Sequence, residues 1–440
     1  MNDQTNPSQP TSRRGFLRTS TSAAIGGVAA NLSLRYKGFA ASDETLRVGL
    51  IGCGGRGSGA TREALKADRY VALTAMGDVF ENQLQNSLKA LRKEAEDKVK
   101  VTPEKCFVGL DAYQKVIDSG VDVVILATPP GFRPQHLKAA VEAGKHAFCE
   151  KPMATDAPGV RSVLESVEIA KRKNLAIVAG FCWRYHAARR EFFRRIHDGA
   201  VGDIRAIYAT YYTSPVKPMP APGERGADTT DLQWQLRNWY NFVWLCGDGL
   251  VEQAVHSIDK IAWALKDTHP IKAVAVGGRQ TENHEGNIYD HIEVNYEFDN
   301  GVRAFMGQRQ IVGCYNQTAD YIMGTKGIGT IGAHRRKDVE ISGGENPWVF
   351  DTSTPVKDMY QAEHDELFAS IRSGFPINDG IRMANSTMLA IMGRMAAYTG
   401  LEVTWEQAIN SQEKLVPENL DWNMKLPIAP MAIPGKTKLI

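Results

Sequence analysis

Three residues in two distant stretches of the chain have side chains suited to acid–base chemistry. Lys151 follows a short apolar run, and Glu252 and His256 lie in a segment whose pattern predicts a helix beginning near Leu250. Oxidation of a secondary alcohol needs a base for the hydroxyl proton, and a histidine titrates near neutral pH. Lys151 could then hold the developing alkoxide while Glu252 orients the pair. We therefore take these three as the candidate catalytic residues.

The same predicted helix carries a polar stripe. Glu252, His256 and Asp259 recur at i, i+4 and i+7, which places them on one face of a helix. This stripe has two interpretations: a solvated face, or a catalytic face turned toward a ligand cleft. Apolar neighbours such as Val255 and Ile258 are compatible with both interpretations.

A glycine-rich turn near the start of the chain predicts a nucleotide-binding element. An apolar run of strand length, 46–51, leads into Gly52, Gly54 and Gly57, and a helical pattern follows. Gly52 permits a tight turn, Gly54 lets the backbone approach a pyrophosphate, and Gly57 lets the helix lie close to the strand. The amides at the start of that helix would face the phosphates.

Asp78 indicates which dinucleotide binds. It lies just beyond a second apolar run, 71–76, where a carboxylate accepts hydrogen bonds from a ribose 2′-hydroxyl. A 2′-phosphate would be repelled by this carboxylate unless Arg56 or another base compensated. The expected cofactor is therefore NAD, with NADP the lesser option.

Two later strand ends extend this cofactor site. The near-continuous apolar runs 121–128 and 146–149 have the pattern of parallel strands buried on both faces. Ligands lie beyond the carboxyl ends of such strands, so the residues there should flank the nicotinamide. The cofactor contacts that we predict are Gly52, Gly54, Arg56, Gly57, Asp78, Thr128, Pro129, His136, Glu150, Lys151 and Arg184.

From about residue 203 the pattern changes to strands joined by turns. An Asp-Asn-Gly sequence between two of these runs is a hairpin signal. The expected strands are 204–212, 271–276, 289–298, 302–311 and 321–324, and the expected later helices are 361–373 and 381–399.

Taken in order, these motifs resemble the glucose-fructose oxidoreductase, inositol dehydrogenase and rhizopine catabolism family of NAD(P)-dependent dehydrogenases. The matching pieces are the glycine turn, Asp78, Ala127-Thr128-Pro129 with His136, Glu150-Lys151-Pro152, 181–185, 199–202 and the segment from Glu252 to Asp259. The resemblance implies catalytic functions for Lys151, Glu252 and His256. It also implies a C-terminal sheet whose free face forms a homo-oligomer. Glu252 stands where the family commonly has Asp, and Ala254 where it commonly has Gly.

We therefore predict an α/β chain with an N-terminal Rossmann domain and a C-terminal α+β domain that has a large, mostly antiparallel open sheet. The predicted divisions are a signal peptide at 1–40, the NAD-binding domain at 45–180, a substrate and oligomerisation domain at 181–375, and C-terminal helices and a tail at 376–440 that pack back on the first domain.

The predicted substrate contacts lie mainly in the second domain. They are Tyr185, Arg237, Trp239, Asp259, Asp290 and His291. The aromatic cluster around Trp239 is equally compatible with core packing and with stacking on a sugar ring. The histidines lack a metal-ligand spacing such as HExxH, so no metal is predicted. The six cysteines form no CxxC pair and are expected to be reduced, in the core or near the site.

The first 40 residues have the pattern of an export signal. Adjacent Arg13 and Arg14, then Phe-Leu and a short stretch of small residues, are typical of a twin-arginine signal peptide. We therefore expect the twin-arginine machinery as a partner, a periplasmic location, and cofactor uptake before export. No apolar run reaches the roughly 20 residues of a membrane span, so no membrane anchor is expected.

The composition excludes several classes of protein. With 43% hydrophobic and 23% charged residues among 440, the chain is typical of globular proteins. A formal net charge of +2 argues against a nucleic-acid partner.

The leading hypothesis is an exported NAD(P)-dependent oxidoreductase that acts on a secondary hydroxyl or ketone of a sugar, cyclitol or glycoside. Its cofactor should be tightly bound, because free NAD is scarce outside the cytoplasm. The alternative is a redox-neutral glycoside hydrolase or epimerase that oxidises the sugar transiently with the same residues. Lys151 and His256 argue against a non-catalytic binding protein, and the lack of repeats argues against a structural surface protein.

Overall fold

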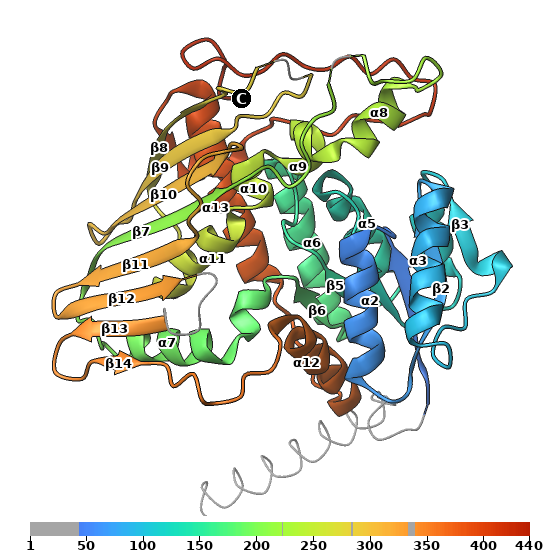
Figure 1. The fold of residues 1–440 in the computed structure, drawn as a ribbon, viewed down its shortest axis with the longest axis horizontal. Coiled ribbons are helices and arrows are strands. Elements are labelled where there is room, and N and C mark those ends of the chain that lie inside the picture. The colour runs from blue at the N-terminus through green and yellow to red at the C-terminus, as the bar shows by residue number, and fades with distance from the viewer. Residues whose placement is uncertain (1–43, 222, 283–284, 333–338) are drawn as a thin grey trace, which may run out of the picture.

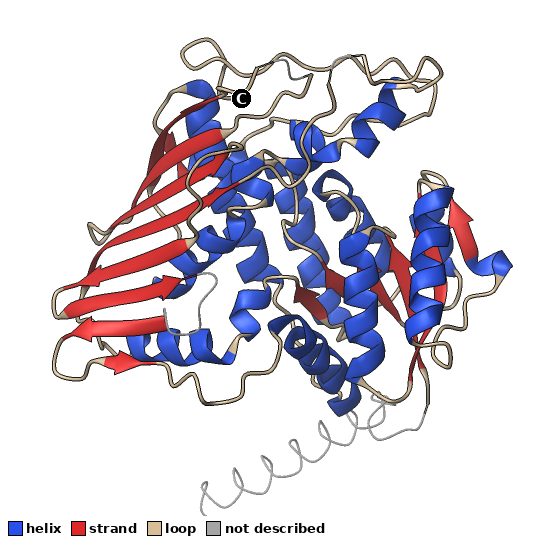
Figure 2. Cartoon of the chain, in the orientation of Figure 1, coloured by secondary structure: helices blue, strands red, loops and turns tan. Residues whose placement is uncertain are grey.

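The chain forms two domains side by side, each built on one sheet (Figure 1). The computed structural model describes residues 44–221, 223–282, 285–332 and 339–440. The signal peptide predicted at 1–40 lies outside these residues. One sheet is parallel with helices on both faces, and the other is large and has helices on one face only (Figure 2). The predicted fold class is confirmed.

The first domain is a six-stranded parallel sheet in the order β3-β2-β1-β4-β5-β6. Strand β4 is apolar and completely buried, as expected for a strand covered on both faces. Helix α6 begins at Asp156, whose side chain accepts from the backbone N–H of Gly159 at 2.8 Å. The elements are β1 (Leu46–Ile51), α2 (Gly55–Ala67), β2 (Val71–Asp78), α3 (Glu81–Glu94), η1 (Pro103–Lys105), β3 (Cys106–Val108), α4 (Ala112–Asp118), β4 (Val123–Leu126), η2 (Pro130–Phe132), α5 (Arg133–Glu142), β5 (His146–Cys149), α6 (Ala157–Lys173), β6 (Ile177–Ala179) and η3 (Cys182–Tyr185).

The second domain is a nine-stranded sheet in the order β14-β13-β12-β11-β7-β10-β9-β8-β15. Its neighbours pair antiparallel except β7 and β10, which pair parallel. Buried and accessible side chains alternate along β9, as expected when one face of a sheet is covered. The elements are α7 (Ala187–His197), β7 (Ile204–Thr213), α8 (Asp231–Arg237), η4 (Trp239–Asn241), α9 (Val243–Cys246), α10 (Gly249–Glu252), α11 (Val255–Ala264), β8 (Lys272–Gly278), β9 (His291–Glu297), β10 (Arg303–Gln310), β11 (Ala319–Gly324), β12 (Gly327–Gly332), β13 (Val339–Gly343), β14 (Trp348–Val349), α12 (Met359–Ser373), α13 (Gly380–Thr399), β15 (Val403–Thr404) and α14 (Trp405–Asn410).

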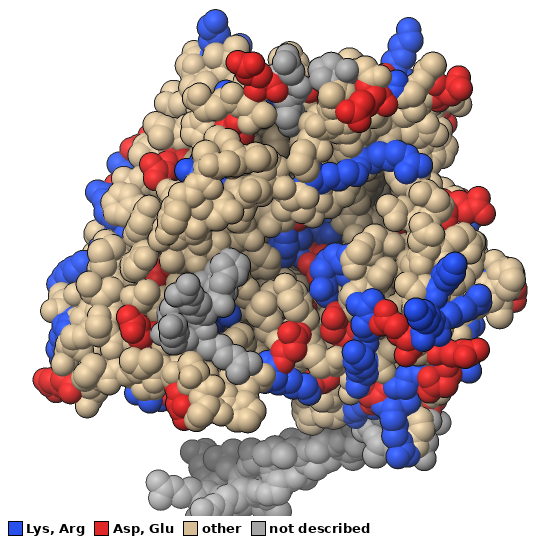
Figure 3. Space-filling model, in the orientation of Figure 1, with Lys and Arg blue, Asp and Glu red and all other residues tan. Residues whose placement is uncertain are grey.

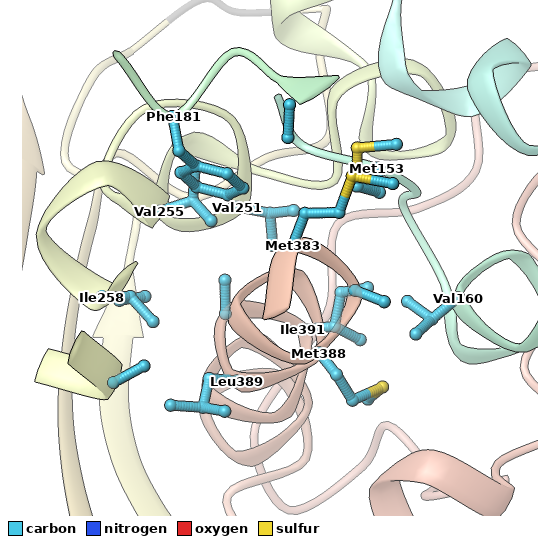
Figure 4. Close-up of a cluster of buried hydrophobic side chains, with 14 of the residues drawn as sticks. Met153, Val160, Phe181, Val251, Val255, Ile258, Met383, Met388, Leu389 and Ile391 are labelled. Carbon is cyan, nitrogen blue, oxygen red and sulfur yellow. The ribbon is translucent and has the colours of Figure 1, made fainter. Parts of the chain in front are cut away.

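Helix α13 joins the two domains through one continuous apolar core. It packs against β8 and β9 of the large sheet, against α6 of the first domain, and against α10 and α11. Figure 4 shows Met383, Met388, Leu389 and Ile391 of this helix pointing toward their apolar neighbours. All four are at most 1% exposed. The segment from α10 to α11 is thereby held against both domains.

The predicted helix beginning near Leu250 is wrong in one respect, because two helical segments stand in its place. Helix α10 ends at Glu252 and α11 begins at Val255. Asp248 begins α10 with a φ of +94° and a side chain that accepts from the N–H of Leu250 at 3.2 Å. The break means that the spacing of Glu252 and His256 does not place them on one face of a single helix.

Contacts at the ends of the second domain cross the predicted divisions. Helix α12, which lies inside the predicted 181–375 domain, packs against α2 of the Rossmann domain. Strand β15, which lies in the predicted C-terminal part, pairs with β8 in the large sheet.

The cysteines are free thiols in the described residues. Cys53, Cys149, Cys182 and Cys246 are buried, as expected for core residues. Cys314 is exposed, so it is not a core residue. No helix of the described chain has the length and apolarity needed to cross a bilayer.

Candidate active site

The glycine turn between β1 and α2 has the shape that a dinucleotide requires. Gly52 has a φ of +96°, and a Cβ there would lie 2.7 Å from backbone atoms of Ala127 and Thr128. A Cβ on Gly57 would lie 2.0 Å from the carbonyl oxygen of Gly52, so only glycine lets α2 approach the turn this closely. A Cβ on Gly54 would meet no atom within 4 Å, so this backbone borders open space. These residues fit a pyrophosphate at the N-terminus of α2.

Asp78 is held at the carboxyl ends of β1 and β2 by two backbone amides. Its Oδ2 accepts from the N–H of Cys53 at 2.6 Å, and its Oδ1 accepts from the N–H of Phe80 at 2.8 Å. Burial raises the pKa of Asp78, while the backbone hydrogen bonds and the charge of Arg237 act in the opposite direction. Each carboxylate oxygen keeps a lone pair, so both oxygens can also accept hydrogen bonds from ribose hydroxyls.

A pocket lies over these strand ends and is closed from the other side by the second domain. Figure 3 shows the surface hollowed between the two domains, with basic and acidic atoms inside the hollow. Lys217, Leu236, Arg237 and Trp239 are the contribution of the second domain. The Rossmann residues that line it are Gly52, Gly54, Asp78, Val79, Phe80, Gln83, Leu110, Ala127, Thr128, Pro129, Phe132 and His136.

Thr128 and His136 are joined at this pocket. Thr128 Oγ1 lies 3.1 Å from His136 Nδ1. Burial, followed by the charge of Arg133, lowers the pKa of His136 to about 3, so the ring is neutral at neutral pH. Arg133 is itself buried and donates to the carbonyl oxygens of Thr128 and Pro152. It therefore ties the ends of β4 and β5 together.

Lys151 and Glu252 form a nearly buried ion pair across the domain boundary. Lys151 Nζ donates to Glu252 Oε1 at 2.8 Å and to the backbone oxygen of Glu252 at 2.5 Å. The two side chains are 10% and 6% exposed. The other carboxylate oxygen, Oε2, accepts from Gln253 Nε2. A lysine ammonium has three protons, so one proton of Lys151 is left for another acceptor.

His256 lies beside this pair and stacks on Trp183. The two ring centroids are 5.2 Å apart with 28° between the planes. Within the described residues, His256 Nδ1 is buried and has no hydrogen-bond partner. Burial and the charges of Lys151, Lys260 and Arg189 lower the pKa of His256 well below its usual value. The imidazole is therefore neutral at neutral pH and can accept a proton.

Glu150 and Arg56 face each other beneath the N-terminus of α2. Arg56 Nε lies 2.7 Å from Glu150 Oε1, and Arg56 Nη2 lies 3.1 Å from Glu63 Oε2. Burial opposes the charge of Arg56, but the two carboxylates raise its pKa overall. Because its charge is already paired, Arg56 is poorly placed to compensate a 2′-phosphate.

Arg184 and Asp259 are paired with each other and do not line the pocket. Arg184 Nε and Nη2 donate to the two carboxylate oxygens of Asp259 at 2.8 and 2.9 Å, and the side chains are 4% and 2% exposed. Ser386 and Asp267 complete the network. The structure thus gives both residues a structural role in place of the predicted cofactor and substrate contacts.

Tyr185 is also directed into the protein. Its hydroxyl donates to Asp379 Oδ2 at 2.8 Å, and the residue is 4% exposed. Its predicted substrate contact is not favoured by this geometry.

The other predicted substrate contacts fall into two groups. Arg237 and Trp239 line the dinucleotide pocket, and the guanidinium of Arg237 lies 4.0 Å from the ring centroid of Phe80. Asp290 borders a separate pocket between the second-domain loops, where its Oδ1 lies 2.8 Å from His291 Nδ1. Lys151 lines neither of these two pockets. No cluster of residues suited to a metal is present in the described chain.

Several residues that complete the site leave only a weak signal in the sequence. Arg133 and Trp183 act through the backbone or through another ring, and such contacts leave no spacing pattern. Tyr240 stacks on Trp239 with centroids 3.8 Å apart. Burial and the nearby charge of Glu252 raise its pKa, so the phenol stays protonated close to the ion pair. The aromatic run around Trp239 was the available signal for Tyr240.

Comparison with known proteins agrees with this geometry. A model for an oxidoreductase family with an NAD-binding Rossmann fold matches residues 46–181. Inositol 2-dehydrogenase from Acidiphilium cryptum is 26% identical over 259 residues, which cover 59% of this chain and 66% of the relative, slightly less than two thirds of its length.

Solved structures share the whole two-domain fold. Aldose-aldose oxidoreductase from Caulobacter crescentus, complexed with glycerol, has a TM-score of 0.64 at 20% identity and covers 82% of this chain and all of its own. A levoglucosan dehydrogenase in complex with NADH and levoglucosan has a TM-score of 0.64 at 18% identity and covers 82% of this chain and 99% of its own. Residues 46–181 thus match the oxidoreductase family with the NAD-binding Rossmann fold, and the two-domain chain shares the fold of these solved structures.

Proposed function

We propose that this protein is an NAD(H)-dependent oxidoreductase that interconverts a secondary hydroxyl and a ketone on a sugar, cyclitol or glycoside. The observation that carries the proposal is the ion pair of Lys151 and Glu252, with His256 beside it, at the carboxyl end of β5. This end of the parallel sheet is where the dinucleotide pocket opens. The ligands of one solved structure with this fold, NADH and levoglucosan, fit the same class of chemistry.

Lys151 is suited to hold the substrate oxygen. Two of its ammonium protons go to Glu252, at Oε1 and at the backbone oxygen. The third proton can be donated to a hydroxyl oxygen, and the positive charge then stabilises that oxygen as it loses its own proton. Glu252 keeps the ammonium in place, and its longer side chain still reaches Lys151.

His256 is suited to accept the hydroxyl proton. Its imidazole is neutral at neutral pH, and its ring is oriented by Trp183. A bound NAD would accept the hydride from the carbon that carries this hydroxyl. In the reverse direction, protonated His256 returns the proton to the oxygen.

NAD is favoured over NADP by the paired charges around Asp78. The carboxylate is fixed by two backbone amides, and Arg56 is occupied by Glu150 and Glu63. A 2′-phosphate would therefore meet an uncompensated carboxylate on the Rossmann side.

The test combines cofactor release with turnover of polyols. Protein purified without added nucleotide is denatured, and the released nucleotide is identified by mass. The intact protein is then mixed with inositols, aldoses and levoglucosan, and absorbance of reduced nicotinamide is followed. We expect NAD(H) and a response to at least one polyol that falls by roughly 10² to 10⁴ in His256→Ala.

One control variant and two alternative outcomes complete the test. Trp348→Ala changes an aromatic side chain of β14, away from the pocket, and should leave turnover unchanged. Absence of any bound or bindable dinucleotide contradicts the proposal. A glycoside cleaved or epimerised with no net change in cofactor would instead favour the redox-neutral alternative, because it uses the same residues.

We also propose that the chain is exported by the twin-arginine route and works in the periplasm. Adjacent Arg13 and Arg14 support this. Replacing both by Lys should leave folded, cofactor-loaded protein in the cytoplasm, as measured by fractionation. Unchanged periplasmic recovery would contradict the proposal.

The open face of the large sheet is proposed as a homo-oligomer interface. Val276, Phe305 and Ile328 are 69%, 40% and 43% exposed on this sheet, and helices cover only its other face. Replacing Val276 and Phe305 together by Lys should reduce the mass measured by light scattering. An unchanged mass would place the interface elsewhere.

A further inference from the structure

The adenosine end of the dinucleotide pocket is bordered by Phe80, whose aromatic ring is contacted by side chains from two other segments of the chain. Phe80 lies two residues after Asp78, lines the pocket, and donates its backbone N–H to Asp78 Oδ1. The guanidinium of Arg237, at the end of α8, lies 4.0 Å from its ring centroid. The ring of Trp422, from the C-terminal segment 411–440, lies 6.2 Å from the same centroid at 48°.

The segment 411–440 is attached firmly to the second domain on one side of this contact. The N–H of Leu426 donates to Asp231 Oδ2 at 3.0 Å, and Gln235 Nε2 donates to the carbonyl oxygen of Leu426 at 2.7 Å. Both partners belong to α8. Figure 1 shows the segment, in red, running past α8 along one edge of the molecule.

The same segment reaches the Rossmann domain on the other side. The N–H of Leu415 donates to Asp156 Oδ2 at 2.8 Å, at the start of α6. Its side chains join an apolar cluster that spans both domains next to the pocket. The cluster is packed on one side by Leu415, Val416, Leu420, Trp422, Leu426 and Ile428 of the segment, and also by Val79, Phe80 and Leu110 of the Rossmann domain.

We infer that Phe80, Arg237 and Trp422 form a clamp that closes the adenosine end of the pocket and slows dissociation of the dinucleotide. The inference rests on the proposed function, because it assumes that the dinucleotide occupies this pocket. Leu236, Arg237 and Trp239 line this pocket from the second domain, and Asp78 and Phe80 line it from the Rossmann domain. Contacts that hold the two sides together would therefore slow release of the adenosine half. Trp422 holds Phe80 to the segment that is fixed to α8. The clamp gives an exported protein a physical means of keeping a cofactor that it cannot replace from solution.

The test measures the dissociation rate of NADH in Trp422→Leu. NADH is bound to nucleotide-free protein, excess ADP-ribose is added, and loss of NADH fluorescence is followed in a stopped-flow instrument. An aromatic ring contact is worth enough to change the rate by roughly threefold to tenfold, so we expect dissociation to accelerate by that factor. Trp422→Phe retains a ring and should stay close to the original rate.

Trp348→Leu is the matched control. Like Trp422, Trp348 has a phenylalanine ring at 6.2 Å, but it belongs to β14. Equal NADH dissociation rates in the Trp422→Leu and Trp348→Leu proteins would overturn the clamp. If Trp422→Leu fails to fold, the comparison is made with Arg237→Gln, which removes the cation over the Phe80 ring and should also accelerate dissociation.

Two further readouts separate the clamp from general loosening and from failure of the proposed function. The clamp should weaken ADP-ribose binding in Trp422→Leu in the same proportion as NADH binding, and leave the KM for the polyol unchanged. A proportional loss in polyol KM would instead show loosening of the whole cleft and overturn the clamp. Absence of NADH binding by the unaltered protein overturns the proposed function itself.

Discussion

At the scale of single residues, the charged groups of the cleft differ in whether any hydrogen-bond donor remains free for a ligand. Lys151 keeps one ammonium proton after pairing with Glu252. The guanidinium of Arg184 instead makes a two-pronged contact with Asp259 and a further one with Asp267, inside the protein. An arginine whose donors are used this fully fixes η3 against α11 and the turn that follows it, because Asp259 lies on α11 and Asp267 lies in that turn.

Breaking the buried pair should cost stability and spare the cofactor site. Arg184→Met leaves Asp259 charged and 2% exposed, and such a change typically lowers the free energy of unfolding by about 3–5 kcal/mol. Adding Asp259→Leu removes the stranded charge and should recover most of the loss. Denaturant unfolding measures both. The double variant should bind NADH normally, whereas Asp78→Ala should not. Weak NADH binding in the double variant would instead favour the predicted contact between Arg184 and the cofactor.

The pH profile of oxidation should report the environment of His256. Burial and three nearby cations lower its pKa well below the usual value. Protonated His256 cannot accept a proton, so the rate falls as the pH drops through that pKa. We therefore expect the acid limb of kcat/KM to lie well below pH 6.5. A limb at or above 6.5, measured where the protein remains folded, would show that another group is the base.

At the scale of elements, the glycine turn and the segment of α10 and α11 differ in how far their sequence determines them. The glycines meet specific steric demands, so their spacing predicts the strand, turn and helix correctly. The polar stripe from Glu252 to Asp259 does not show that the helix breaks after Glu252. The start of α10 likewise depends on Asp248, whose carboxylate accepts from the N–H of Tyr289 and the hydroxyl of Tyr398, two residues distant in sequence.

This contrast explains which parts of the site could be predicted. Asp78 and Lys151 are fixed by local motifs, and the structure places both at the strand ends where parallel sheets bind ligands. Asp259 and Tyr185 have residue types suited to ligands, but their partners come from segments far along the chain. Trp422 lies in a segment without helix or strand, so no periodicity indicates that it reaches Phe80.

Two glycine substitutions should separate the two steric requirements of the turn, which are close approach of α2 and room for the pyrophosphate. Gly57→Ala places a methyl group 2.0 Å from the Gly52 oxygen, so α2 must shift, and both stability and NADH affinity should fall. Gly54→Ala meets no protein atom within 4 Å, so stability should hold while the methyl group obstructs the pyrophosphate. Calorimetry and thermal unfolding measure the pair. Normal NADH affinity in Gly54→Ala would show that the pyrophosphate does not approach this backbone.

At the scale of the whole molecule, buried neutral histidines link stability to pH. Burial is the main cause that lowers the pKa of His136 and His364 to about 3 and that of His146 to about 4. In the unfolded chain a histidine titrates near 6.5. Between these values the unfolded state binds more protons than the folded state. The contribution of these histidines is therefore complete above about pH 6.5 and is lost progressively as the pH falls toward 4.

His364 gives the sharpest test of this linkage. It is completely buried, its ring lies 4.3 Å from that of Phe148, and it lies on α12, which packs against the nucleotide-binding helix α2. His364→Phe keeps an aromatic ring but removes the titrating group. The variant should be less stable at pH 7, because the hydrogen bond from His364 Nδ1 to the Tyr360 oxygen is lost. Below pH 6.5 its free energy of unfolding should decline by about 1 kcal/mol less per pH unit than that of the unaltered protein. Buried carboxyl groups with raised pKa values act in the opposite direction, but they are common to both proteins and cancel in the difference. Urea unfolding from pH 7 to 4.5 measures this difference in slope, with His269→Phe, at an exposed histidine, as control. Parallel curves for His364→Phe and the unaltered protein would contradict the linkage.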